Sequence, residues 1–337
     1  MVVYIHYMTY LVTGGAGFIG SHMVDYLLKE GHTVIVVDNL SSGKRENLAH
    51  HDNNSHLITY RRNACDGLED ILEHFTPINA IIHFAGVPGV QLSIQHPETT
   101  HHFNLNGTLN LLESARRFKV KRFIFSSSAA VYGDQEVMPL REDVHPHPLS
   151  PYALHKLTGE HYCRLYHELY GLETISLRYM NVFGSRQDPA GPYASAIPRF
   201  INLLLRGIAP RINGDGEQTR DFIHVDDVVQ AVKRALLVED RVIFGTAFNI
   251  GSGTGISVNE VVRHIMQIAE QDVRSEYTPP VVEIRHSRAD ISKAKTLLDW
   301  EPKKDFLEGL QETYRHMKKS EEIIHQEDPY VIGAHLR

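Results

Sequence analysis

The sequence predicts an α/β fold in which a doubly wound parallel sheet is followed by a smaller α/β lobe. In the first half of the 337 residues, short apolar runs alternate with helical patterns. Unbroken apolar runs are typical of parallel strands that are covered on both faces. A glycine-rich turn follows the first apolar run, and from Gly184 onward proline and glycine divide the chain into short segments. We therefore expect a large sheet domain first and the smaller lobe after it.

The composition is that of an ordinary folded protein, with 42% hydrophobic and 22% charged residues. A net charge of −7 gives no general attraction to nucleic acid or to an anionic membrane, so we expect neither as a partner. Two cysteines make no disulfide framework, and no apolar run is long enough to span a membrane. No signal peptide is evident, so we expect the cytoplasm. Residues 1–7 either lengthen the first strand or precede a second reasonable start at Met8.

The first strand, residues 10–12, leads into TGGAGFIG (13–20) and then into a helical pattern over 21–30. Strand, glycine turn and helix in this order are typical of a Rossmann-type dinucleotide-binding domain, where the helix N-terminus holds the diphosphate. A simple glycine-rich turn is the alternative. The second strand, 32–37, ends in Asp38 and favours dinucleotide binding.

Each residue of this turn has an expected task. Gly14 permits a tight turn, Gly17 lets the backbone approach the pyrophosphate, and Gly20 lets the helix pack on the strand. A carboxylate at Asp38 would bind the ribose hydroxyls and repel a 2′-phosphate, which favours NAD over NADP. The cofactor contacts that we expect from this stretch are Gly14, Gly17, Phe18, Ile19 and Asp38.

The next segments extend the cofactor site. The polar loop 39–43 either contacts the adenosine, through Asn39, Ser42 and Gly43, or is a surface turn. After the strand 57–60, Asp66 either accepts a hydrogen bond from adenine or caps the helix 67–75. The strand 80–84 ends at Phe84, and Ala85 and Gly86 are small enough for the cofactor to pass close by.

Polar side chains also follow the later strands. The helix 97–118 has apolar positions that serve either the core or an interface, and the strand 121–125 ends in serines at 126–128. Ligands bind beyond the carboxyl ends of such strands, although serines also begin many loops. Tyr152 and Lys156 share a face of the helix 152–170, and an ammonium beside a phenol lowers the pKa of the phenol. Because this pair follows a dinucleotide turn, we interpret it as a general base and its partner.

The remaining strands and helices are expected in the C-terminal half of the sequence. Strands are expected at 174–179, 220–225 and 247–250, with helices at 228–237 and 258–270. We expect residues 1–180 to form the NAD-binding domain, 221–250 to return to it, and 181–337 to form the substrate lobe with a poorly packed tail from about 318. The 22 histidines, including His50–His51, show no HExxH or Cys/His spacing. We interpret them as surface residues and expect no metal site.

Eight motifs together resemble those of the extended short-chain dehydrogenase/reductases, and within them the NAD-dependent UDP-sugar 4-epimerases. They are TGGAGFIG (13–20), VVDNLSSG (36–43), HFAG (83–86), SSSAAVYGD (126–134), SPYALHK (150–156), LRYMNVFG (177–184), NGDGEQTRDFIHVDD (213–227) and RHSRADISKAKTLLDWEP (285–302). The resemblance runs from about residue 10 to residue 302.

The resemblance implies a function and site roles. Tyr152 would take the C4 hydroxyl proton while the hydride moves to a tightly bound NAD⁺, and the 4-keto sugar would turn before the hydride returns. Lys156 would bind the nicotinamide ribose, and Ser128 would bond the reacting oxygen. Further expected contacts are Tyr179 to the cofactor and Asn181, Arg220, Ser287 and Arg288 to the substrate. Helices 97–118 and 152–170 would form a homodimer interface.

Single positions indicate which reaction and which sugar are expected within the family. Dehydratases of the family carry Asp-Glu where this chain has Ala129–Ala130, so dehydration is disfavoured. Asn181, where glucuronate epimerases often have Thr, favours a neutral sugar. A small Ser287 leaves room for an acetamido group, which favours UDP-GlcNAc/UDP-GalNAc, with UDP-Glc/UDP-Gal possible. Alternatives are UDP-glucuronate 4-epimerase, a net dehydrogenase, and a non-catalytic NAD-binding protein.

One segment departs from the family pattern. The family's Arg-x-Gly-Asp is replaced by PVVE at 280–283. With Pro280 in place of the diphosphate-binding arginine, Arg274, Arg285 or Arg288 is the expected substitute.

Overall fold

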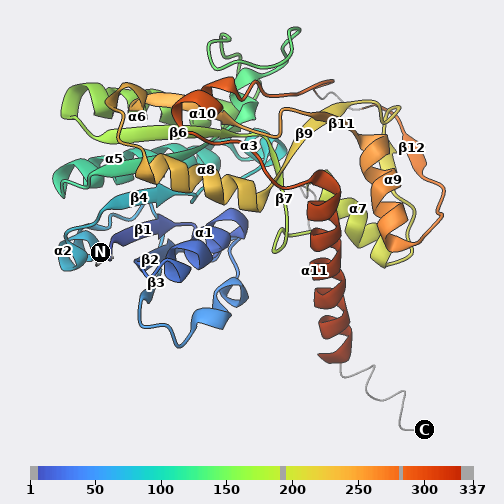
Figure 1. Cartoon of the computed structure of the whole chain (residues 1–337), viewed down its shortest axis with the longest axis horizontal. Helices are drawn as coiled ribbons and strands as arrows, with labels where there is room; N and C mark the ends of the chain where they lie inside the picture. Colours follow the sequence, from blue (N-terminus) through green and yellow to red (C-terminus); the bar gives the residue numbers. More distant parts are fainter. Residues whose placement is uncertain (1–6, 190–194, 281–283, 328–337) are drawn as a thin grey trace, which may run out of the picture.

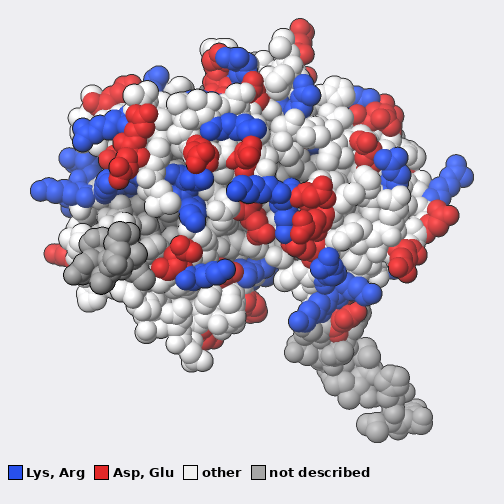
Figure 2. Space-filling model, in the orientation of Figure 1, with Lys and Arg blue, Asp and Glu red and all other residues white. Residues whose placement is uncertain are grey.

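The computed structural model describes residues 7–189, 195–280 and 284–327. A large sheet domain lies beside a smaller lobe, from which the long C-terminal helix projects (Figure 1). No helix within these ranges is long and apolar enough to cross a membrane. Basic and acidic side chains are interspersed over the face drawn in Figure 2.

The central sheet has seven parallel strands in the order β10-β6-β5-β4-β1-β2-β3. Its strands are β1 (Thr9–Thr13), β2 (Thr33–Asp38), β3 (Leu57–Arg61), β4 (Ala80–His83), β5 (Arg122–Ser128), β6 (Glu173–Tyr179) and β10 (Thr246–Ile250). The strand order reverses between β1 and β4, which places a ligand crevice at their carboxyl ends. The predicted doubly wound parallel sheet is confirmed.

Helices cover both faces of this sheet. On one face α1 (Phe18–Lys29), α8 (Val225–Leu237) and α10 (Ser292–Leu297) bury residues such as Met23 and Val232. On the other face α2 (Glu69–Phe75), α5 (Gly107–Arg117) and α6 (Pro151–Tyr170) bury residues such as Ile71 and Leu112. The only tryptophan, Trp300, is buried in the first of these cores, and its Nε1 donates to the Asp227 carbonyl at 3.0 Å. The two cores fix the sheet between its helices.

The helix α6, predicted over 152–170, has local signals at both of its ends. The Ser150 hydroxyl accepts a hydrogen bond from the Ala153 N–H, and Pro151 occupies the first turn. Gly171 ends the helix in a left-handed conformation. The predicted helix 97–118 is instead three consecutive pieces: α4 (Pro97–His101), a π-helical turn (His102–Asn106) and α5.

The smaller lobe has its own sheets and core. One sheet has the order β11 (Gly255–Ser257), β9 (Thr219–His224), β7 (Asn181–Phe183), and the other pairs β8 (Arg211–Asn213) with β12 (Glu276–Thr278). Helices α7 (Ala196–Leu205), α9 (Val258–Ala269) and α11 (Phe306–Glu327) enclose the third core, which includes Phe200, Val261 and Leu310. Short elements complete the fold: α3 (Val90–Gln95) and 3₁₀ turns at Arg45–Asn47, Ala49–His51, Ala129–Tyr132 and Arg241–Ile243.

The stretch 221–250, predicted to return to the NAD-binding domain, is divided in the structure. The strand β10 pairs with β6 and α8 packs on the sheet, whereas β9 pairs with β7 and β11. The difference arises because β9 contributes to two cores, with Phe222 in the lobe and Ile223 against the main sheet. An apolar run alone does not distinguish these two sheets.

The expectation for the histidines is corrected in part. The interpretation of the histidines as surface residues is wrong for His83, His155 and His224, which are buried. The stretch from residue 318, expected to pack poorly, is helical as far as Glu327, and Lys318, Lys319 and Ser320 on it are exposed, so the helix does not contradict that expectation. The first strand begins at Thr9, and the proposed extension in residues 1–6 lies outside the described residues.

Candidate active site

A cleft of about 700 Å³ opens at the carboxyl ends of the central strands, at the point where the strand order reverses. Its lining includes most of the residues that the sequence assigns to the cofactor: Gly14, Gly17, Phe18, Ile19, Asp38, Asn39, Ser42, Phe84, Ala85, Gly86, Tyr152, Lys156 and Tyr179. Gly43 and Asp66 are not part of this lining. The structure therefore gathers these distant motifs in one place.

The glycine turn is shaped to admit a flat, phosphate-bearing ligand. Gly14 has φ +70°, and a Cβ there would lie 2.7 Å from the Ala85 nitrogen, so only glycine fits without a shift. No side chain caps the start of α1, and its first turn has no acidic residue. An uncapped helix N-terminus presents backbone N–H groups and a positive dipole end to an anion. These features fit the diphosphate of NAD.

The adenosine end of the cleft is formed by the ends of β2 and β3. The Asp38 carboxylate accepts hydrogen bonds from the backbone N–H groups of Ala16 (3.0 Å) and Leu40 (2.8 Å), which hold it at the edge of the cleft. Gly43 packs against this carboxylate, since a Cβ there would be 2.8 Å from Asp38 Oδ1. A carboxylate fixed in this position fits ribose hydroxyls.

Asp66 does not cap α2, because Leu68 occupies the N-cap position and no side chain caps the helix. Its carboxylate instead accepts a hydrogen bond from Asn63 Nδ2 at 3.0 Å, and Asn63 Oδ1 accepts one from Asn39 Nδ2 at 2.6 Å. The capping alternative is therefore wrong. The adenine contact stays a prediction, with Asn63 lying between Asp66 and the cleft wall at Asn39.

The catalytic candidates meet where β5 ends beside α6. Tyr152 and Lys156 both line the cleft, and Lys156 Nζ lies 5.8 Å from the centre of the Tyr152 ring. Lys156 Nζ donates to the Ser126 carbonyl at 2.7 Å. The Ser128 hydroxyl accepts from the Ala130 N–H, and the Ser128 side chain also hydrogen-bonds Tyr152. Tyr152 and Lys156 therefore share one wall of the cleft, and Ser128, which is not part of the lining, adjoins that wall through Tyr152.

Burial controls the ionisation of this pair. It raises the pKa of Tyr152, while the hydrogen bond with Ser128 acts to lower it. The depression of the Tyr152 pKa by Lys156, which the sequence predicts, does not dominate here, because Lys156 Nζ is directed at a backbone carbonyl. Burial lowers the pKa of Lys156 to about 8, and the nearby Glu160 carboxylate opposes that change.

A buried polar network supports this wall from behind. Arg178 donates to both carboxylate oxygens of Glu160, at 2.9 and 2.7 Å, and Ser127 donates to the same carboxylate. Arg178 also donates to the Tyr132 hydroxyl at 2.9 Å, which in turn donates to Asn249 Oδ1 at 2.7 Å. The network joins β5, α6 and β6 behind the serines, and so fixes these three elements relative to one another.

The expected substrate residues lie outside the cofactor lining and gather around β9. Asn181 Nδ2 donates to the Asp221 carbonyl at 3.3 Å, and the Ser287 N–H donates to the Thr219 carbonyl at 3.1 Å. Arg220 lies on β9 itself, while Arg288 is an exposed neighbour of the buried Ser287. The structure thus places Asn181 and Ser287, from two other segments, against β9, which carries Arg220.

The candidates for the missing family arginine differ in their surroundings. Arg285 makes a two-pronged ion pair with Asp215, both distances being 2.8 Å, on the surface. Arg274 and Pro280 are exposed, and residues 281–283 of the departing segment lie outside the described residues. Because Arg285 is engaged with Asp215, Arg288 is the better placed of the three, directly beside Ser287.

Two parts of the cleft wall were missed by the sequence analysis. Arg62 and Asn63 line the cleft directly after β3, and their position at a strand end is a signal that could have found them. The segment at Arg186–Asp188 also lines it, and the Asp188 carboxylate lies 3.5 Å from Lys44 Nζ. No sequence pattern points to this second wall, because it is brought there by the chain between the two lobes.

Comparison with known proteins agrees with this geometry. The family model for the NAD dependent epimerase/dehydratase family matches residues 10–251. A UDP-glucose 4-epimerase from Thermotoga maritima, solved with UDP-glucose, is 41% identical, with a TM-score of 0.86 over 93% of this chain and 99% of that one. A UDP-N-acetylglucosamine 4-epimerase from Methanobrevibacter ruminantium, in complex with UDP-N-acetylmuramic acid, is 38% identical, with a TM-score of 0.88 over the same shares.

A third solved structure also covers nearly the whole chain. The UDP-glucuronic acid 4-epimerase from Bacillus cereus, with UDP-glucuronic acid and NAD, is 33% identical, with a TM-score of 0.86 over 93% of this chain and all of that one (100%). The family match spans the glycine turn, the serine-tipped strand and the Tyr152–Lys156 helix. The chain therefore belongs to the NAD dependent epimerase/dehydratase family, and NAD is its cofactor.

Proposed function

We propose that this protein interconverts the C4 epimers of a UDP-hexose and keeps NAD bound throughout the cycle. The observation that carries the proposal is that Tyr152 and Lys156 line the cleft beside the glycine turn, with the Ser128 side chain bonded to Tyr152. A phenol, a hydroxyl and an ammonium in this arrangement suit proton transfer at a sugar hydroxyl.

Each step of the proposed reaction is assigned to particular residues of this chain. NAD, held by Gly14, Gly17 and Asp38, would supply a hydride acceptor for C4 of the sugar and a hydride donor for the opposite face of the 4-keto sugar. Tyr152 takes the proton of the C4 hydroxyl as a general base and later gives it back, while Ser128 holds the reacting oxygen. The charge of Lys156, 5.8 Å from the Tyr152 ring, acts toward the ionised phenol and against the larger effect of burial. Asn181, Arg220 and Arg288 hold the diphosphate side of the substrate, so that the sugar can turn.

The preferred sugar is an N-acetylhexosamine or the corresponding hexose. Ser287 is small and buried beside β9, which leaves room for an acetamido group where a bulky side chain would clash. The solved relatives are named for UDP-glucose, UDP-N-acetylglucosamine and UDP-glucuronic acid, so all three sugars belong in the assay. Asn181 favours a neutral sugar over glucuronate.

The deciding experiment incubates the purified protein, shown to contain NAD, with UDP-GlcNAc, UDP-Glc and UDP-GlcA in separate reactions without added NAD⁺. Conversion of at least one substrate to its C4 epimer is expected, with UDP-GlcNAc fastest. Steady NADH formation and consumption of added NAD⁺ would instead indicate a net dehydrogenase. No turnover of any of the three by NAD-loaded protein would contradict the proposal.

A homodimer through α6 is the second part of the proposal. Leu154, Leu165, Leu169 and Tyr170 are large apolar side chains on this helix, and all four are at least 40% exposed in the single chain. Burying them against a second copy would remove apolar surface from water. Light scattering after gel filtration should give twice the mass of the chain, and Leu165→Glu with Leu169→Glu should give a monomer.

A further inference from the structure

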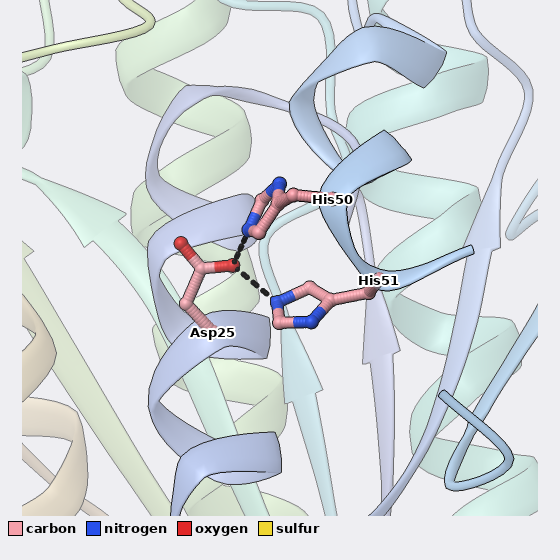
Figure 3. A group of neighbouring side chains, drawn as sticks. All are labelled: Asp25, His50 and His51. Carbon is pink, nitrogen blue, oxygen red and sulfur yellow. Dashed lines mark hydrogen bonds and ion pairs between the residues drawn. The ribbon is translucent and has the colours of Figure 1, made fainter. Parts of the chain in front are cut away.

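Asp25, His50 and His51 form a compact group away from the catalytic residues. Asp25 lies on α1, and the two histidines lie on the 3₁₀ turn that crosses it. Figure 3 shows both imidazoles directed at the same carboxylate oxygen, and each Nε2 lies 2.8 Å from Asp25 Oδ1. The side chains are 47% exposed at His50, 29% at Asp25 and 18% at His51, so the group is open to solvent on one side.

These three donors have the chemistry and spacing of a transition-metal site. All three ligand atoms lie within 4.8 Å of one another. Bonds of about 2.0–2.2 Å at cis or tetrahedral angles place ligands roughly 2.9–3.5 Å apart, so small side-chain rotations bring the observed 2.8 Å separations into that range. Two imidazoles and one carboxylate prefer Zn²⁺ or Ni²⁺ to Mg²⁺ or Ca²⁺. The open side leaves space for water ligands.

The neighbouring Arg186 sets the strength of such a site without blocking it. Its guanidinium donates to the other carboxylate oxygen, Asp25 Oδ2, at 2.6 Å, which leaves Oδ1 to the metal. A positive charge this close weakens the binding of a cation, so we expect micromolar rather than nanomolar affinity.

The group His224, Asp226 and Glu312 also has metal-ligand spacing, but it already has a cation. Lys304 Nζ lies 2.6 Å from Glu312 Oε1 and 3.9 Å from Asp226 Oδ2. An ammonium therefore occupies the place that a metal ion would take. At Asp25 the Arg186 guanidinium contacts only the carboxylate oxygen turned away from His50 and His51, and in the described part of the chain no lysine forms an ion pair with Asp25, so this group is the better candidate.

We propose that Asp25, His50 and His51 bind one divalent transition-metal ion, of which Zn²⁺ is the expected species. The ion would fasten the turn at His50–His51 to α1. Segments on either side of this junction, at Lys44, Asn47 and Arg186, line the cofactor cleft, so the ion would stabilise the wall at one end of it. This proposal does not depend on the sugar reaction, and it replaces the expectation of no metal site, which considered only spacing along the sequence.

The test uses NAD-containing protein without a histidine tag, stripped with chelator and titrated calorimetrically with ZnCl₂, with MgCl₂ as the hard-ion control. One equivalent of Zn²⁺ should bind, and Mg²⁺ should not. The variant His50→Asn/His51→Asn should bind Zn²⁺ at least tenfold more weakly. The matched control His145→Asn/His147→Asn removes two exposed histidines of one loop and should bind as wild type does.

A stability measurement separates metal binding from misfolding. Zn²⁺ should raise the unfolding temperature of wild type and of the control but not of the His50/His51 variant, because only a ligand of the native state shifts the transition. The single change His50→Asn, at the most exposed ligand, serves if the double variant does not fold. Equal Zn²⁺ affinity in wild type and in the folded variant, or no stoichiometric binding by wild type at about 100 μM, would overturn the proposal.

Discussion

At the scale of single residues, Lys156 has a side chain that the proposed reaction needs but whose buried charge lowers the stability of the fold. Burial lowers its pKa to about 8 from an ordinary value of 10.5, so its charged form is disfavoured in the folded protein. Between these two values the unfolded chain binds more protons than the native one, so the free energy of unfolding rises as the pH rises. Below pH 8 Lys156 is charged in both states, so the full free-energy cost of burying its charge lowers the stability of the native protein.

We predict that Lys156→Met is more stable than wild type at pH 7 and almost inactive. The gain in unfolding free energy should be on the order of 1–3 kcal/mol, because the methionine has no charge to desolvate. The gain should shrink as the pH approaches 10.5. Urea unfolding at several pH values checks this, with the exposed Lys29→Met as the control that should change little. A loss of stability at pH 7 would show that the bond from Lys156 to Ser126 outweighs the burial of its charge.

Tyr152→Phe keeps the ring and removes only the hydroxyl. We predict that turnover falls by about 10²–10⁴-fold, because the general base is lost. The amount of NAD that is purified with the protein should not change. Epimerase assays and extraction of the cofactor check the two halves, and retained turnover would exclude Tyr152 as the base.

At the scale of elements, the contact between α6 and β6 depends on one buried ion pair. The side chains of Glu160 and Arg178 are 8% and 6% exposed. We predict that Glu160→Gln lowers the free energy of unfolding by about 3–5 kcal/mol, because it leaves the Arg178 charge buried without its partner. Arg164 and Glu168 form a pair on the surface of the same helix, each 55% exposed. The control Glu168→Gln should therefore change stability by about 1 kcal/mol or less.

The turn between β1 and α1 offers a second matched comparison. Gly14 and Gly171 have nearly the same φ, +70° and +72°, but a Cβ at Gly14 would meet the backbone of Ala85 whereas one at Gly171 would meet nothing within 4 Å. Gly171→Ala should cost about 1–2 kcal/mol in backbone strain and retain NAD. Gly14→Ala should cost more and lose NAD. Chemical unfolding and the absorbance of bound cofactor check both, and equal behaviour would mean that strain alone, and not close approach, explains Gly14.

Local sequence signals predicted the elements well for a physical reason. The glycine turn before α1 and the extent of α6, predicted over 152–170 and observed as Pro151–Tyr170, each depend on residues within a few positions of one another. The π-helical turn at His102–Asn106 and the placement of β9 depend on packing against distant segments. Hydrophobic periodicity gives no information on either.

At the scale of the whole molecule, part of the site is formed by segments whose position cannot be predicted from local sequence patterns. Most of the cleft lining was predictable because these residues follow strands in a parallel sheet, where carboxyl ends share one edge. The wall at Arg186, Gln187 and Asp188 comes from the crossing between lobes, and the cluster of Asp25 with His50 and His51 comes from two separate elements. Both required three-dimensional proximity.

Asp221, on β9 of the smaller lobe, hydrogen-bonds the segments that follow β10 and Ser287. Its buried carboxylate accepts hydrogen bonds from the N–H groups of Ser252 (2.7 Å), Gly253 (3.0 Å) and Ala289 (3.0 Å), the last of these beside Ser287 and Arg288. We predict that Asp221→Ala raises KM for the UDP-sugar by about tenfold or more, since lost bonds to a charged group are worth about 1.5–3 kcal/mol each. NAD content should stay unchanged. A parallel loss of NAD would show that Asp221 supports the entire fold rather than the substrate side.

The burial of Trp300 gives the protein a built-in optical probe. It is the only indole in the sequence, and it is packed in the core against α8 and bonded to the Asp227 carbonyl, so it supplies a single indole emission signal from the core of the sheet domain. Its emission band overlaps the absorption of reduced nicotinamide. A transient dip in this fluorescence during turnover would therefore report the reduced cofactor inside the protein, without any label.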